Sequence, residues 1–108
     1  MDDLTKLNQI FNKWNASFND GGFHNFLWQL IINKAHENKI KALFPAIAIN
    51  GYELGLVISN SKGYIRTSAF FLDHDFHVAQ LVCDELNKDI FNLSIPQAND
   101  IVLSSMFA

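Results

Sequence analysis

The sequence predicts an α+β fold in the order ααβββαα, with a three-stranded antiparallel meander packed against helices. Apolar residues recur at helical spacing in the first 40 residues, and the spacing changes to two over residues 44–72. Helical spacing returns afterwards, behind two helix-capping signals. A length of 108 residues is usual for one domain. We therefore expect one domain over 1–108, made of a helical hairpin (1–40), a sheet (41–72) and two C-terminal helices (73–108).

The first 40 residues have the pattern of two amphipathic helices. Steps of three and four place one apolar stripe on the first helix, formed by Leu4, Leu7, Phe11, Trp14 and Phe18. The segment Asn19-Asp20-Gly21-Gly22 is expected to end this helix, because glycine adopts the left-handed backbone conformation without steric cost. A second helix is expected over residues 23–37, with a main apolar side of Phe23, Phe26, Leu27, Leu30 and Ile31.

Residues 44–72 predict three strands joined by two tight turns. Asn50-Gly51 is the dipeptide best suited to a two-residue type I′ turn, which places strands at about 44–49 and 52–59. A second turn at Asn60-Ser61-Lys62-Gly63 leads to a third strand at 64–72, rich in β-branched and aromatic residues.

Two capping signals predict the C-terminal helices. Asp73-His74-Asp75 supplies carboxylates for the start of a helix whose apolar face, expected to cover the sheet, is Phe76, Ala79, Cys83, Leu86, Ile90 and Leu93. Ser94 and Gln97 have the spacing of a capping box, and Pro96 lies in the first turn, where its missing N–H is harmless. A short helix over residues 95–106 follows.

Composition and charge argue against several classes of function. The net charge is −3 and Arg66 is the only arginine, so the basic surface of a duplex-binding protein is missing. One cysteine excludes an intrachain disulfide. Met1-Asp2-Asp3-Leu4 lacks the basic start of a signal peptide, and no apolar run is long enough to span a bilayer. We expect a cytoplasmic protein with no membrane contact.

The second half of the chain carries a series of short motifs. They are Gly51-Tyr52-Glu53-Leu54-Gly55, Gly63-Tyr64, Glu85-Leu86-Asn87, Leu93-Ser94, Ala98, Ile101-Val102 and Ser104-Ser105-Met106. In these residues, which span about half of the chain, it resembles small uncharacterised proteins of phage and plasmid genomes. The resemblance implies a mobile-element setting, in which small proteins often bind a host protein, and it carries no established activity that could be transferred to residues of this chain.

The third predicted strand supplies the candidate partner-binding residues. Strict alternation puts Tyr64, Arg66 and Phe70 on one face, and the matching residues of the second strand are Glu53 and Val57. Protein interfaces are enriched in aromatic residues and arginine. Ten phenylalanines and two tryptophans also exceed what one small core hides, so some aromatic surface should remain for a partner. In the alternative interpretation, the first two helices bury this face.

The sequence offers two further candidates for a reactive site. Asp73, His74, Asp75 and His77 form a cluster of ligand-type residues, but capping explains the acids and no third converging ligand is evident. Cys83 falls on a core stripe beside acidic neighbours, which favours a buried, unreactive thiol. We therefore assign no catalytic residue, metal or cofactor.

The sequence favours a small non-enzymatic protein-interaction or regulatory module, which works as a dimer or by docking on a host protein. One alternative is a small metal-dependent hydrolase built on Asp73, His74, Asp75 and His77. A second alternative is a single-stranded nucleic-acid binder that stacks bases on Tyr64 and Phe70.

Overall fold

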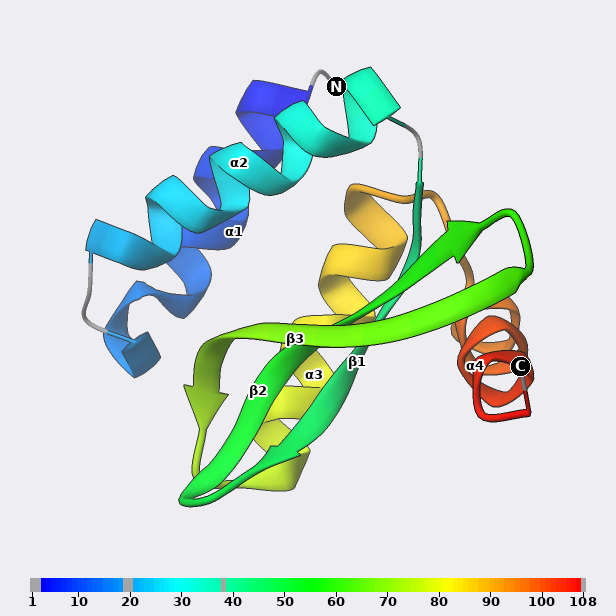
Figure 1. Cartoon of the computed structure of the whole chain (residues 1–108). Coiled ribbons are helices and arrows are strands. Elements are labelled where there is room, and N and C mark those ends of the chain that lie inside the picture. Colours follow the sequence, from blue (N-terminus) through cyan, green and yellow to red (C-terminus); the bar gives the residue numbers. More distant parts are fainter. Residues whose placement is uncertain (1–2, 19–20, 38, 108) are drawn as a thin grey trace.

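The computed structural model describes residues 3–18, 21–37 and 39–107, and its helices and strands follow the predicted order. The elements are α1 (Asp3–Phe18), α2 (Gly21–Glu37), β1 (Ile40–Ala48), β2 (Gly51–Asn60), β3 (Gly63–Asp73), α3 (Phe76–Asp89) and α4 (Ile95–Ser105). The strands form one antiparallel sheet in the order β1-β2-β3. The predicted α+β class and three-stranded meander are confirmed (Figure 1).

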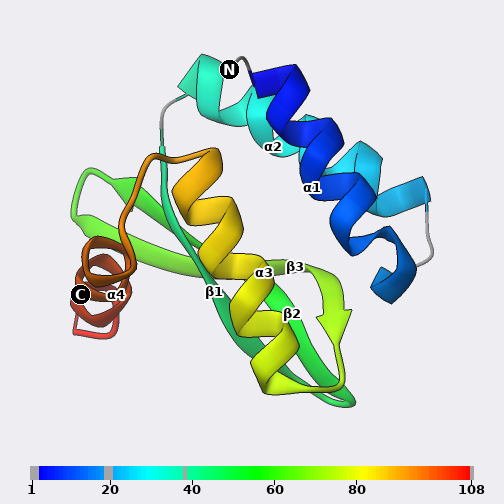
Figure 2. The same ribbon diagram turned by 180° about the vertical axis from the view of Figure 1, so that it is seen from behind.

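Different helices cover the two faces of the sheet. The inner face packs on α3 and on the α1–α2 hairpin in the main core, and its buried strand residues are Leu43, Leu54 and Leu72. The outer face carries Ala42, Phe44 and Val57, which pack against Ile101 and Val102 of α4. Figure 2 shows α3 in front of the strands and α4 far from the α1–α2 hairpin. The prediction that α3 covers the sheet is confirmed, but the helix on the second face is α4.

The α1–α2 hairpin closes one end of the main core. Its buried side chains are Leu7, Ile10, Phe23, Leu27, Leu30 and Ile31, whereas Leu4 is exposed. α1 ends at Phe18, as expected, and Asn19 and Asp20 lie outside the described residues. Gly21 and Gly22 form the first turn of α2 and do not terminate α1.

Both predicted caps of the C-terminal helices are confirmed. The Asp75 carboxylate accepts hydrogen bonds from the backbone N–H groups of His77 and Val78 at the start of α3. At the start of α4, Ser94 and Gln97 form a reciprocal capping box. These caps fix where each helix leaves the sheet.

The first hairpin turn lies one residue earlier than predicted. Ala48 pairs with Gly51, so the turn residues are Ile49 and Asn50. Asn92 is the one described non-glycine residue with positive φ, which excludes a type I′ turn here. Gly51 has a φ of +147°, and an added Cβ would lie 2.5 Å from the Asp73 carbonyl oxygen. Glycine is needed because the end of β3 passes close by.

Bulges in β3 reverse part of the predicted face assignment. Gly55 of β2 pairs with Ser68, whereas Glu53 pairs with Phe71, so β3 holds one extra residue in this interval. An extra residue moves the following side chains to the other face. Phe70 consequently enters the main core, where its ring centroid lies 5.5 Å from that of Phe26. Phe71 lies on the outer face instead.

The side chain of Asn87 closes the free edge of β1. Its buried amide oxygen accepts a hydrogen bond from the Leu43 N–H (2.8 Å), and its amide nitrogen donates to the Leu43 carbonyl (3.0 Å). Pro45, the next β1 residue that points the same way, has no N–H to offer. The bonded backbone of Leu43 and the missing N–H of Pro45 together protect this edge from pairing with another strand.

Replacing Asn87 by alanine should remove both hydrogen bonds and leave buried backbone groups of Leu43 without partners. We expect the free energy of unfolding to fall by about 2–4 kcal/mol, measured by urea denaturation. Asn99→Ala on the exposed side of α4 is the matched control and should change the value by no more than about 0.5 kcal/mol. Equal losses in the two variants would show that the Asn87 amide contributes nothing to the edge.

Candidate functional site

The outer face of the sheet is organised around Phe44. The Phe44 ring lies directly over Gly55, where an added Cβ would come 2.5 Å from a ring carbon. The guanidinium carbon of Arg66 lies 4.2 Å from the centroid of the same ring, within cation–π distance. Gly55 thus makes room for the ring, and the ring positions the arginine.

The five predicted partner-binding residues do not share one exposed surface. Val57 is 0% exposed and Tyr64 is half-buried, both in the small core beneath α4. Arg66 is exposed, and the half-buried Glu53 accepts a hydrogen bond from the Ser68 hydroxyl (3.4 Å). Glu53, Val57, Tyr64 and Arg66 share the outer face as predicted, but α4 covers part of that face and the β3 bulge turns Phe70 inward.

The same geometry removes the proposed platform for stacking nucleic-acid bases. Tyr64 packs in the outer small core, whereas Phe70 packs in the main core on the opposite face. Bases that stack along a strand need aromatic rings on one accessible face. These two rings do not provide it.

The acidic and histidine cluster is used for local hydrogen bonding. Asp75 caps α3, and the Asp73 carboxylate accepts a hydrogen bond from the Asp75 N–H (2.9 Å). Nδ1 of His74 lies 2.6 Å from the Asn50 carbonyl oxygen, so this nitrogen is the donor. Within residues 3–18, 21–37 and 39–107, no three His, Cys, Asp or Glu side chains converge. The hydrolase alternative therefore has no ligand set in this part of the chain.

Cys83 lies in the main core and is fully buried. Burial raises the pKa of its thiol far above the usual range, and the negative charge of Asp84 raises it further. The thiol stays protonated at neutral pH and is shielded from solvent. It serves as a small apolar core residue, as its position in the sequence predicted.

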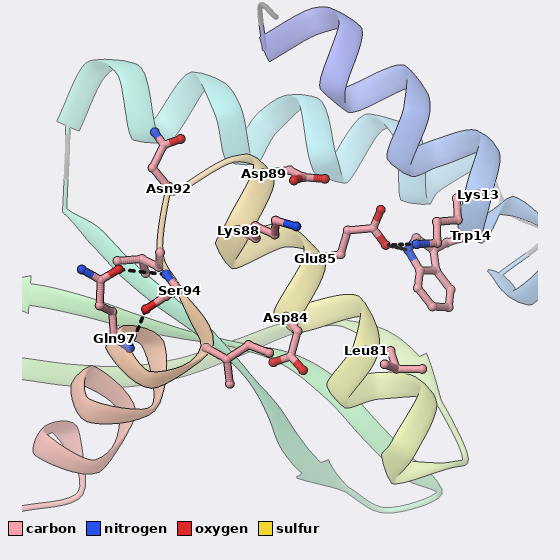
Figure 3. A pocket seen from close by; sticks show the side chains of 12 residues that line it. Lys13, Trp14, Leu81, Asp84, Glu85, Lys88, Asp89, Asn92, Ser94 and Gln97 are labelled. Carbon is pink, nitrogen blue, oxygen red and sulfur yellow. Dashed lines mark hydrogen bonds and ion pairs between the residues drawn. The ribbon is translucent and has the colours of Figure 1, made fainter.

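A cleft of about 830 Å³ lies between α1, α3 and the segment leading to α4 (Figure 3). At one end, Oε2 of Glu85 accepts a hydrogen bond from the indole N–H of Trp14 (2.8 Å) and lies 2.9 Å from Nζ of Lys13. At the other end, Ser94 and Gln97 are engaged in the cap of α4. The contacts of Glu85 fasten α1 to α3, and the polar groups of Ser94 and Gln97 are used in the helix cap.

The end of the β1–β2 hairpin exposes a group of large apolar side chains. Ile47 is 87% exposed, Ile49 is 100% exposed and Phe71 is 42% exposed. Together with Ala48 they line a shallow hollow of about 840 Å³, whose other residues are Asn50, Glu53 and His74. We call Ile47, Ala48, Ile49 and Phe71 the hairpin patch. Its sequence signal is an apolar Ile-Ala-Ile run that leads directly into a turn.

The hairpin patch is held in place from behind. The His74 ring bonds the carbonyl of Asn50 in the turn, and Gly51 fits closely against the backbone of Asp73. These contacts join the hairpin end to the last residue of β3 and to the residue that follows it. The hairpin end is therefore fastened to the sheet, and the patch extends around it, because Ile47 pairs with Tyr52 of the inner face and Phe71 pairs with Glu53 of the outer face.

No protein-family model, curated protein or solved structure matches the chain. Functional inference therefore depends on the chain's own geometry. None of the described helices is long and apolar enough to cross a membrane.

The contact between Phe44 and Gly55 can be tested by a double-mutant cycle. Gly55→Ala should lower the free energy of unfolding by about 1–3 kcal/mol, because the new methyl group overlaps the ring. In a Phe44→Leu background the same substitution should be close to neutral, since no ring lies over the glycine. Urea denaturation of the four proteins gives the coupling energy. Equal costs of Gly55→Ala in both backgrounds would contradict this packing.

Proposed function

We propose that this protein is a small interaction module that binds another protein through the hairpin patch. The exposure of Ile47 and Ile49 carries this proposal. Grouped apolar side chains on a fixed surface are typical of interaction sites. Burying one isoleucine side chain contributes about 1.5–3 kcal/mol, so these two residues can supply a large part of a binding free energy.

The composition of the hollow supports a protein as the ligand. An apolar centre is bordered by polar groups of Asn50, Glu53 and His74, an arrangement usual in protein interfaces. Among the described residues that line the hollow there is no lysine or arginine to attract an anionic nucleic acid. A protein surface that suits this hollow is apolar and carries a hydrogen-bond donor for the Glu53 carboxylate.

Fixed geometry also favours binding. The His74–Asn50 hydrogen bond and the fit of Gly51 against Asp73 hold the hairpin end before any partner arrives. A surface that is already ordered loses little conformational entropy on association. In this proposal the partner is a cytoplasmic host protein, as the resemblance of residues 51–106 to proteins of mobile elements implies, and the module regulates it without catalysis or a cofactor.

The test compares wild-type protein with an Ile47→Asp/Ile49→Asp double variant. Wild-type and variant protein are each used to capture partners from a lysate of the native host. A host protein that the wild type retains is then purified, and its affinity for the wild type and for the variant is measured by titration. We expect the variant to bind at least about 100-fold more weakly, because two apolar contacts are replaced by charges. Thermal stability should change little, since both side chains are exposed.

Leu103→Asp is the matched control, because Leu103 is also an exposed apolar residue but lies on α4. This variant should bind the purified partner as tightly as the wild type does. Equal affinity of the partner for the wild type and the double variant would exclude the hairpin patch as the binding site.

A further inference from the structure

The bonding of Leu43 identifies which cross-strand pairs of the sheet are hydrogen-bonded and which are not. Because Leu43 gives both backbone groups to Asn87, it cannot bond its cross-strand neighbour Leu56. In antiparallel strands, bonded and non-bonded pairs alternate. The backbone groups of Leu56 therefore point to β3, where Leu56 pairs with Thr67. The hydrogen bond from the Ser59 N–H to the Lys39 carbonyl (2.9 Å) fits the same alternation.

The alternation defines the free edge of β3. Gly63, Ile65 and Thr67 bond β2, so three residues direct their N–H and C=O groups away from the sheet: Tyr64, Arg66 and Ser68. Residues 65–68 are all exposed, and no hydrogen bond of a described residue to these outward groups is recorded.

The two edges of the sheet differ sharply. The β1 edge is closed by Asn87 and contains Pro45, whereas residues 63–68 of β3 contain neither a proline nor a lysine. Proteins usually block exposed edges with such residues, because an open edge is a template for another strand. The open β3 edge thus has the form of a strand-pairing site.

We propose that β3 pairs antiparallel with β3 of a second copy of the chain, about a twofold axis at Ile65. The pairing joins two three-stranded sheets into one continuous sheet. Each Tyr64 then faces Arg66 of the second copy, and the two exchange backbone hydrogen bonds. The Ile65 side chain, 49% exposed in the single chain, meets its own counterpart at the axis.

Charge and the bulge favour this register over the next two axes toward the C-terminal end of β3. An axis at Arg66 would set two guanidinium groups directly opposite each other, which is destabilising in cross-strand pairs. An axis at Thr67 would require Tyr64 to pair with Phe70 of the second copy, beyond the bulge and next to Phe26 of α2. An axis at Ile65 avoids both conflicts and opposes two apolar side chains.

This inference goes beyond the proposed function, because it uses the β3 edge and leaves the hairpin patch free. The two surfaces have no residue in common, so either proposal can fail without the other. Substitutions at Ile65 test only the pairing of two copies, and substitutions at Ile47 and Ile49 test only the binding of another protein.

The first experiment is disulfide cross-linking of single-cysteine additions under mild oxidation. In Ile65→Cys the two new thiols face each other at a non-bonded pair, where Cα atoms are about 4.5 Å apart and suit a disulfide. In Thr67→Cys, the matched control on the same strand face, the thiols are offset by four residues, roughly 13 Å along the strand. The native Cys83 is buried and does not compete.

We expect Ile65→Cys to form a covalent dimer and Thr67→Cys to remain monomeric on non-reducing gels. Cross-linking of Thr67→Cys in place of Ile65→Cys would overturn the proposed register. Cross-linking of neither variant would overturn the proposed pairing.

The second experiment measures self-association by light scattering over a concentration series. Wild-type protein should pass from monomer to dimer as its concentration rises, and Ile65→Lys should weaken this association by about tenfold or more because two charges meet at the axis. Thr67→Lys, which faces glycine in the second copy, should dimerise like the wild type. A wild-type chain that stays monomeric throughout overturns the proposal and leaves the edge to a strand of another protein.

Discussion

The double hydrogen bond between Asn87 and Leu43 is the contact on which the arrangement of the sheet depends. It joins residues 44 positions apart and fastens α3 to the edge of β1. This buried amide meets both a donor and an acceptor, so its oxygen, its nitrogen and both backbone groups of Leu43 have partners. Because both backbone groups of Leu43 point to Asn87, the alternation along the strands identifies which residues of β2 and β3 bond each other. The contact closes the β1 edge, whereas the β3 edge is open because β3 is the last strand of the sheet.

The aromatic surplus of the sequence is largely absorbed inside the fold. Phe44 lies over Gly55 on the outer face, and Phe70 enters the main core beside Phe26. α4 covers most of the remaining outer face. Exposed apolar area on the sheet is consequently concentrated at the hairpin patch and at Ile65, which are the two places where we expect binding.

Local signals predicted the elements well, because helix caps and turns depend on a few adjacent residues. Asp75 and the Ser94–Gln97 capping box begin their helices as expected. The face assignment failed after Ser68, because the bulge allows Phe70 to pack on α2, a contact that alternation along one strand does not encode. The role of Asn87 was equally out of reach, since its partner is distant in the sequence. A glycine inside a strand, such as Gly55, is typical of a close contact, but the sequence does not reveal that Phe44 fills the space above it.

Backbone hydrogen exchange, followed residue by residue by NMR over a dilution series, tests most directly which amides of the sheet are hydrogen-bonded. The Leu43 and Thr67 amides should exchange slowly at every concentration, since they donate hydrogen bonds to Asn87 and to β2. The Arg66 amide should exchange fast in dilute protein and slow down as the concentration rises. A Leu43 amide that exchanges as fast as that of Arg66 in dilute protein would contradict the central role given to Asn87.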